Sequence, residues 1–205
     1  MAMKFLRIIL IVLLITSSIA TGQTANQQSA ATGCNLTETT APAIRGIRLG
    51  MTAEQLLALF PGSSEKAAIK RALEEAKSPK SYDIGRLYFQ ISEYAEKDRF
   101  AGVDYVSVVT YKDRVTEFTV LYNGPNSDGP YWRHIDEWIA KLSEAFGLPG
   151  AAYWEGGTLK CSGIEIIADI QSGAGKISLR NPAYHKEVRD HAKAYEEKKR
   201  REFKP

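Results

Sequence analysis

The chain has 205 residues, of which 44% are hydrophobic and 25% are charged, and its formal net charge at pH 7 is +3. This composition is typical of a soluble globular protein. The segment 184–205 holds eight lysines and arginines and five acidic residues, so it accounts for the whole net charge (8 − 5 = +3). The basic excess belongs to a tail, and we therefore predict neither a nucleic-acid-binding surface nor a nucleic-acid partner.

Residues 1–22 have the pattern of a secretory signal peptide. Two basic residues precede an apolar run at 8–15, and small residues suit cleavage after Ala20 or Gly22. A membrane-spanning helix needs about 20 apolar residues, so this run is too short to remain as an anchor. We expect a protein exported to the periplasm or secreted, with no membrane span after the signal is removed.

A flexible leader is predicted over residues 23–43, because this segment is rich in small polar residues and has no apolar period. It contains Cys34, and the other cysteine of the chain is Cys161. An even cysteine count in an exported protein favours a disulfide between them. Two alternatives stay open, namely lipidation of Cys34 and thiols that are free or bonded between molecules.

A single α+β domain is predicted over residues 44–182, and it begins with two short helices. Thr52 and Gln55 form a capping box at the start of a helix that extends to residue 60. A second helix is expected over 64–77, where apolar residues recur on one face. Both helices carry an apolar stripe, so we expect them to pack on a sheet.

Strand patterns follow these helices. Alternation from residue 87 to 91 predicts one strand, and β-branched and aromatic residues over 103–111 and 115–122 predict a hairpin. Turn signals at 123–130 then lead into the clearest helix of the chain, at 131–146.

The last strands of the domain are expected at 151–155, 158–161, 163–170 and 176–179. Helices that alternate with runs of hairpin-linked strands indicate a mainly antiparallel sheet. The order of helices followed by strands occurs twice, so the domain is predicted to consist of two weakly similar α-β halves. A charged helical tail is expected over 183–205, with a narrow apolar stripe that suits docking on the domain or on a partner.

The segment at 46–52, with the sequence GIRLGMT, precedes a helix that ends in Phe60-Pro61-Gly62 and then a hairpin. This arrangement resembles the repeat of the β-lactamase-inhibitory-protein and SmpA/OmlA-type outer-membrane modules. The resemblance implies short helices against an antiparallel sheet and a function in binding other proteins. It carries over no binding residue.

Residues of catalytic or metal-binding type form no workable arrangement in the sequence. His134 and Glu137 are spaced as two ligands on a helix, but a zinc site needs three or four ligands. His185 and His191 lie on different sides of the tail helix. The chain has no Gly-x-Ser-x-Gly motif, and the GAGK stretch at 173–176 lacks the Ser or Thr of a phosphate loop. We therefore predict no catalytic residue, no metal and no cofactor.

Two aromatic pairs are the candidate partner-binding residues, namely Tyr131 with Trp132 and Tyr153 with Trp154. Tyrosine and tryptophan are frequent anchors at interfaces, although both tryptophans could instead close the core. The sequence predicts an exported, non-catalytic binding module for a protein or cell-envelope component. Two alternatives remain, a hydrolase whose active-site residues come from distant strands and a structural subunit that assembles through its tail.

Overall fold

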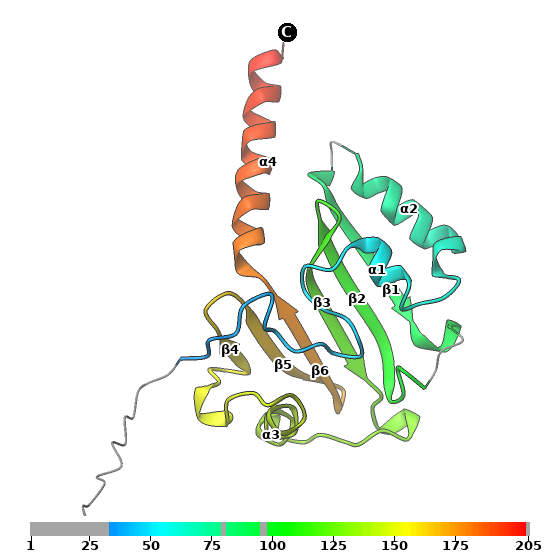
Figure 1. The fold of residues 1–205 in the computed structure, drawn as a ribbon, viewed down its shortest axis with the longest axis vertical. Helices are drawn as coiled ribbons and strands as arrows, with labels where there is room; N and C mark the ends of the chain where they lie inside the picture. The colour runs from blue at the N-terminus through cyan, green and yellow to red at the C-terminus, as the bar shows by residue number, and fades with distance from the viewer. Residues whose placement is uncertain (1–32, 79–80, 95–97, 204–205) are drawn as a thin grey trace, which may run out of the picture. The chain divides into compact units, whose positions relative to one another are not determined.

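The computed structural model describes residues 33–78, 81–94 and 98–203 (Figure 1). The predicted signal peptide and residues 23–32 of the predicted leader lie outside them. The described chain forms an α+β fold with a six-stranded antiparallel sheet in the order β1-β2-β3-β6-β5-β4. Its strands are β1 (Ile84–Gln90), β2 (Val103–Tyr111), β3 (Arg114–Tyr122), β4 (Thr158–Lys160), β5 (Glu165–Gln171) and β6 (Ala174–Arg180). Its helices are α1 (Ala53–Leu57), α2 (Ala67–Ala76), α3 (Ile135–Phe146) and α4 (Pro182–Glu202).

The sheet consists of two three-stranded meanders that meet at β3 and β6. The first half places α1 and α2 before β1-β2-β3, and the second half places α3 before β4-β5-β6. The halves join through an antiparallel ladder from the pair Glu117–Arg180 to the pair Leu121–Lys176. Figure 1 shows α1 and α2 beside the first meander and α3 beside the second. The predicted α+β class and the mainly antiparallel sheet are confirmed.

One face of the sheet packs on the helices and carries the core. In β1 the side chains of Leu87 and Phe89 are buried, while those of Arg86 and Tyr88 are exposed, as the period of a strand requires. Phe60, after α1, stacks on Phe89 with ring centroids 3.9 Å apart. In the second half, the buried face of α3 consists of Trp138, Ile139 and Leu142.

Both predicted N-terminal helices are shorter than we expected. The capping box is present, since the Thr52 hydroxyl accepts a hydrogen bond from the Gln55 amide at 3.1 Å and the Gln55 side chain accepts one from the Thr52 amide at 2.9 Å. Helix α1 nevertheless ends at Leu57, because the amides of Leu59 and Phe60 bond to carbonyls three residues back in a tight turn. Residues 63–65 form a separate 3₁₀ turn after Gly62, which has a left-handed backbone, so α2 begins only at Ala67.

Two further expectations about local structure need correction. The helix expected to begin at Tyr131 begins at Ile135, because the Trp132 amide donates to the carbonyl of Gly173 at 3.0 Å and holds the preceding segment extended along the β5–β6 turn. The strand expected at 151–155 is replaced by a 3₁₀ turn at Ala151–Tyr153 with hydrogen bonds to carbonyls three residues back. A tertiary contact thus overrides the local pattern before α3, and a local 3₁₀ turn replaces the strand expected after it.

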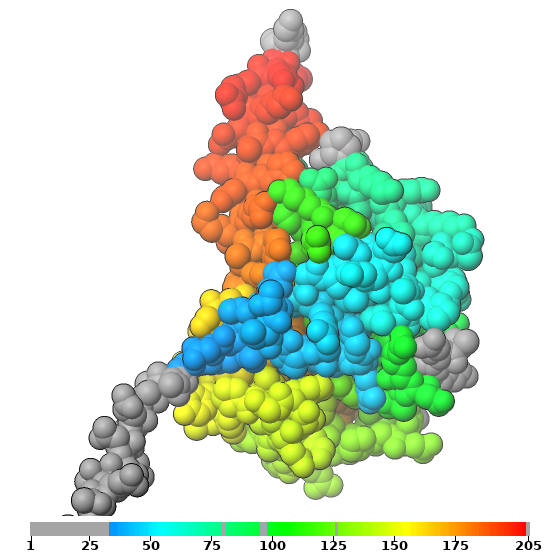
Figure 2. Space-filling view, in the orientation of Figure 1, coloured from blue at the N-terminus to red at the C-terminus, as the bar shows by residue number. Residues whose placement is uncertain are grey.

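The N-terminal arm, residues 33–43, is fixed to the second half of the domain. Cys34 and Cys161 form a disulfide, as the cysteine count favoured. Beyond the disulfide, the amides of Ser162 and Gly163 donate to the carbonyls of Cys34 and Leu36 at 2.9 and 3.1 Å. Figure 2 shows this arm lying across the surface of the domain. Residues 33–43 are therefore part of the folded domain, although their composition predicts a flexible leader. The disulfide and the two backbone hydrogen bonds hold them in place.

The predicted tail forms one continuous helix, α4, after the Asn181 N-cap. None of its residues is buried, but its partly buried face consists of Tyr184, Val188, Ala192 and Tyr195. This face meets the β1–β2 end of the sheet, where Tyr184 contacts Tyr111 and Tyr195 contacts Tyr82 with ring centroids 6.1 and 5.6 Å apart. Phe203, which the stripe also includes, is 75% exposed. No helix in the described ranges is long and apolar enough to cross a membrane.

Candidate ligand-binding pocket

A cavity of about 840 Å³ lies between α3 and the adjoining ends of β2 and β3. The first half contributes the chain before β2 and the end of β3, the connecting segment 127–132 forms another part, and the second half contributes the face of α3 that carries Trp138, Leu142 and Phe146. This volume falls in the range of ordinary small-ligand sites, about 300–1,000 Å³. We call this cavity the aromatic pocket, after the four rings that line it, those of Tyr122, Trp132, Trp138 and Phe146.

Helix α3 supplies two of the four rings in the aromatic wall. Trp138, Leu142 and Phe146 recur at intervals of four residues, which places them on one face of the helix. The Trp138 ring packs against Trp132 and Tyr122 with centroids 5.1 and 5.3 Å apart. Its Nε1 donates to the carbonyl of Lys176 in β6 at 2.9 Å, which fixes the orientation of the indole.

A glycine in β6 allows Trp138 to sit against the strand. A Cβ atom at Gly175 would lie 2.8 Å from the Trp138 ring. A side chain at this position would therefore displace the indole, and the pocket wall depends on Gly175 as well as on the aromatic residues.

Arginines line the pocket on the side of the first half. Arg45 and Arg99 both border it, and Asp128 is its acidic residue. The Arg45 guanidinium donates to the carbonyl of Ala101 at 2.6 Å and lies 6.0 Å from the centroid of the Tyr122 ring. Burial raises the pKa of the Tyr122 hydroxyl above its ordinary value. A positive border and an apolar wall favour a ligand with an apolar body and a negative or hydrogen-bond-accepting end.

Trp132 carries a hydrogen-bond donor without a partner. Its Nε1 is buried and makes no hydrogen bond with any residue in the described ranges. A buried indole N–H usually finds an acceptor. Trp132 lines the aromatic pocket, but its Nε1 is closed to solvent, so an acceptor in the pocket reaches this atom only when the side chain shifts.

The structure separates the four predicted partner-binding residues. Tyr131 and Tyr153 are 59% and 52% exposed, and neither lines the pocket. Trp154 is buried in the core, where its Nε1 donates to the carbonyl of Pro149 at 3.0 Å. Only Trp132 belongs to the pocket. Trp154 is therefore a core residue, whereas Tyr131 and Tyr153 are exposed on the surface.

Sequence reasoning missed most of the pocket residues. Trp138 and Phe146 are part of the α3 stripe, which sequence alone assigns to the core. Tyr122 ends a predicted strand, and its position beside the turn-rich segment at 123–130 is the one sequence signal that could have indicated a site there. Arg45 and Arg99 lie in connecting segments far apart in the sequence, and only the fold brings them to the same cavity.

The histidines lie apart from one another. His134 is exposed at the start of α3, and His185 contacts Glu117 with Nε2 and Oε2 3.2 Å apart. His191 lies against Tyr82 with ring centroids 6.1 Å apart. In the part of the chain that the structure describes, no group of three histidine, cysteine or acidic residues is arranged to hold a metal ion.

Comparisons of the chain with models of protein families, with curated proteins and with solved structures find no match. The proposal for function therefore rests on the fold and the aromatic pocket.

Proposed function

We propose that this protein is an exported binding module that holds a segment of a protein, or a component of the cell envelope, in the aromatic pocket. One observation carries the proposal, a cavity of ligand size with four aromatic rings in its wall and two arginines beside them. Aromatic rings and arginine are the residue types most enriched at binding hot spots.

The pocket groups are suited to holding a ligand without changing it chemically. The Trp132 indole offers its ring to an apolar group, and the guanidinium groups of Arg45 and Arg99 offer positive charge. Rings fixed by packing and by the Trp138–Lys176 hydrogen bond need little further ordering when a ligand binds. The ligand is expected to place an apolar or aromatic group against the rings of Trp132 and Trp138 and a carboxylate or carbonyl oxygen near Arg45 and Arg99.

Export is part of the proposal. The Cys34–Cys161 disulfide supports it, because such bonds persist mainly in oxidising compartments. The signal peptide stays a prediction, and the intact mass of the protein recovered from outside the cytoplasm tests it. A mass that lacks the first 20 or 22 residues is expected, and a mass that retains them would contradict export by signal cleavage.

The binding site is tested with three matched variants. Trp132→Ala removes the unpartnered donor and a ring, Arg45→Ala removes positive charge, and Tyr153→Ala removes an exposed ring outside the pocket. Trp132→Ala should bind the envelope component that the wild-type protein recovers with a binding free energy about 2 kcal/mol less favourable than that of wild type. Tyr153→Ala should retain wild-type recovery.

Circular dichroism and melting temperature verify that each variant is folded. Equal recovery by folded Trp132→Ala and wild-type protein would show that the aromatic pocket is not the binding site. Loss of recovery in Tyr153→Ala alone would move the site to the surface around the 3₁₀ turn at Ala151–Tyr153.

A further inference from the structure

The outer edge of β1 has no strand partner among the described residues. β1 ends the sheet, and β2 is its one neighbour in the described chain. In an antiparallel ladder, alternate residues direct their N–H and C=O groups away from the neighbouring strand. The Lys112 amide donates to the carbonyl of Asp83 at 3.0 Å, so Asp83 belongs to the set that faces β2. The outward set is therefore Ile84, Arg86, Tyr88 and Gln90, and no backbone hydrogen bond from another described residue reaches it.

Two hollows follow this edge between β1 and α2. The larger one, about 390 Å³, is lined on one side by Ala68, Ile69 and Ala72 of α2 and on the other by Arg86, Tyr88 and Gln90. The smaller one, about 240 Å³, continues toward Ile84 and is lined by Ala72 and Glu75 of α2. We call the two hollows together the edge groove.

The edge groove lies beside the backbone of β1 and not over one face of the sheet. Helix α2 covers the face that carries Leu87 and Phe89, and a Cβ atom at Gly85 would lie 3.2 Å from the Cβ of Ala76. Arg86 and Tyr88 point to the opposite face. A hollow lined both by α2 and by these two side chains must therefore pass along the strand edge.

We propose that β1 and α2 bind an extended peptide segment of a partner protein, which joins the sheet as an additional strand. This mode of recognition uses main-chain hydrogen bonds for affinity and side-chain pockets for specificity. The seven residues of β1 direct four residues outward, enough for a ladder with a short strand. The two hollows, of about 390 and 240 Å³, have room for a few side chains each, so they fit one strand and not the sheet and helix of a second copy.

The groove also defines the peptide's side chains. On the α2 side, Ala68 and Ala72 leave room for small apolar residues. On the other side, the added strand meets Tyr88, which is 53% exposed, and Arg86, which forms no ion pair with another described residue. The expected partner segment therefore alternates small apolar residues with acidic or aromatic ones.

A displayed library of random heptapeptides, selected on the intact protein, tests this proposal with the variant pair Arg86→Pro and Arg86→Ala. Proline removes an outward N–H, and it is tolerated on an edge strand when that side has no partner in the sheet. Alanine removes the same side chain and retains the N–H. The selected peptides should bind Arg86→Pro at least about tenfold more weakly than wild type, and Arg86→Ala only a few-fold more weakly.

A second measurement keeps the test independent of how well Arg86→Pro folds. The selected peptide is N-methylated at alternate residues, in two versions. Methylation of the residues that face β1 should abolish binding, and methylation of the other set should not. Amide exchange at Arg86 and Tyr88 in the wild-type protein should slow when the peptide binds.

Four results would overturn the proposal. The selection could yield no peptide, or peptides that bind Arg86→Pro as tightly as wild type. The peptides could lose binding in Trp132→Ala, which would assign them to the aromatic pocket. Sedimentation could show a dimer of the protein whose β1 amides are already protected, which would make the edge an interface between two copies.

Discussion

The two halves of the sheet have the same element order, but their outer strands, β1 and β4, differ in length and in how their outer edges are covered. β4 has three residues, and its outer edge is closed at both ends. Glu155 and Thr158 exchange backbone hydrogen bonds of 2.8 and 3.0 Å at one end, and the Ser162 amide bonds to Cys34 of the arm at the other. β1 has seven residues, and its outer edge is open.

This difference indicates that edge protection is specific to one half. An open edge strand is a site for pairing with another chain, so proteins usually shorten or cover it. Here the arm and its disulfide close the β4 edge, while the β1 edge lies beside a groove that α2 lines. We interpret the closed edge as a device for stability and the open edge as a surface for binding.

The helices differ between the halves as well. Helix α2 presents alanines at 68 and 72 to the edge groove, whereas α3 presents Trp138 and Phe146 to the aromatic pocket. Small residues leave space beside a strand, and large rings build the wall of a cavity. The two helices therefore line hollows of different kinds.

Removal of the disulfide should have the largest effect on stability and should make the two edges more alike. The double variant Cys34→Ser/Cys161→Ser loses a bond between residues 127 apart in sequence. We expect the free energy of unfolding in urea to fall by about 4 kcal/mol, because the unfolded chain gains the entropy of an open loop.

The same variant should speed amide exchange at Ser162, because the arm that accepts its hydrogen bond is released. Either single serine variant, kept reduced, is the matched control and should lose the same stability. A loss below about 1 kcal/mol would show that the non-covalent contacts of the arm are sufficient to hold it.

A core substitution in the first half should have the next largest effect. Phe60 is fully buried and stacks on Phe89 and Phe100, with centroids 3.9 and 4.8 Å apart. Phe60→Ala should reduce the free energy of unfolding by about 3 kcal/mol, because it leaves a cavity between α1 and the sheet. Binding at the aromatic pocket should persist in the folded fraction. A change within about 0.5 kcal/mol would mean that this cluster does not hold the first half together.

Deletion of α4 should have a smaller effect and tests how the tail links the halves. The helix continues from β6 in the second half but contacts Tyr82 and Tyr111 in the first. Deletion of residues 184–205 removes both aromatic pairs and should cost about 2 kcal/mol, together with a loss of helical circular dichroism. Deletion of residues 203–205 is the matched control, and it should leave stability unchanged. Equal stability of the two truncated proteins would show that α4 is not docked.

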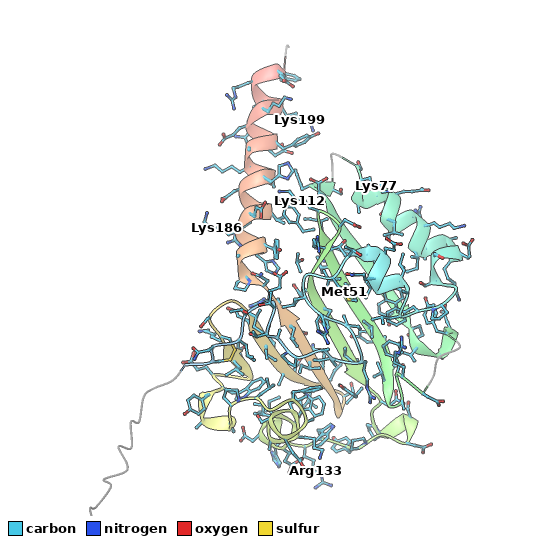
Figure 3. All side chains as sticks on the ribbon, viewed as in Figure 1. Met51, Lys77, Lys112, Arg133, Lys186 and Lys199 are labelled. Carbon is cyan, nitrogen blue, oxygen red and sulfur yellow. A yellow bond between two sulfur atoms is a disulfide. The ribbon has the colours of Figure 1, made fainter. Side chains whose placement is uncertain are left out.

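The smallest predicted effect is a pH dependence of tail docking. The Lys112 ammonium lies 2.6 Å from a carboxylate oxygen of Glu187, and Figure 3 places Lys112 at the hairpin turn next to α4. This hydrogen bond lowers the pKa of Glu187 and raises that of Lys112. Docking through this pair should be complete at neutral pH and weaken as pH falls below about 4.3, the ordinary pKa of glutamate.

The chemical shifts of the Tyr184 ring report this contact in a pH titration. Glu187→Gln should remove the acid-dependent change and leave the helix in place. A titration of Tyr184 that is the same in Glu187→Gln and wild-type protein would assign the pH dependence to another group.

Local signals predicted those parts of the fold that depend on neighbours in sequence. The Thr52–Gln55 capping box, the β2–β3 hairpin and the end of α3 at Gly147 all follow from short patterns. Residues 131–134 and 151–155 were assigned wrongly, because a bond to Gly173 and a 3₁₀ turn decide their conformation.

The candidate sites depend on contacts that a single sequence does not reveal. The residue type of Trp132 predicts a role in partner binding, and the structure places this residue in the aromatic pocket. Arg45 and Arg99 reach that pocket from loops with no distinguishing pattern. The edge groove arises because α2 packs beside a terminal strand, and strand order is a property of the whole sheet.

Residue-resolved hydrogen exchange of the free protein tests the contrast between the two edges most directly. The amides of Arg86 and Tyr88 should exchange rapidly, since each is directed away from β2 without a partner in the described chain. The amides of Thr158 and Ser162 should be protected by Glu155 and Cys34. Protection of Arg86 and Tyr88 equal to that of Ser162 would contradict the account, because it would mean that the β1 edge is already closed.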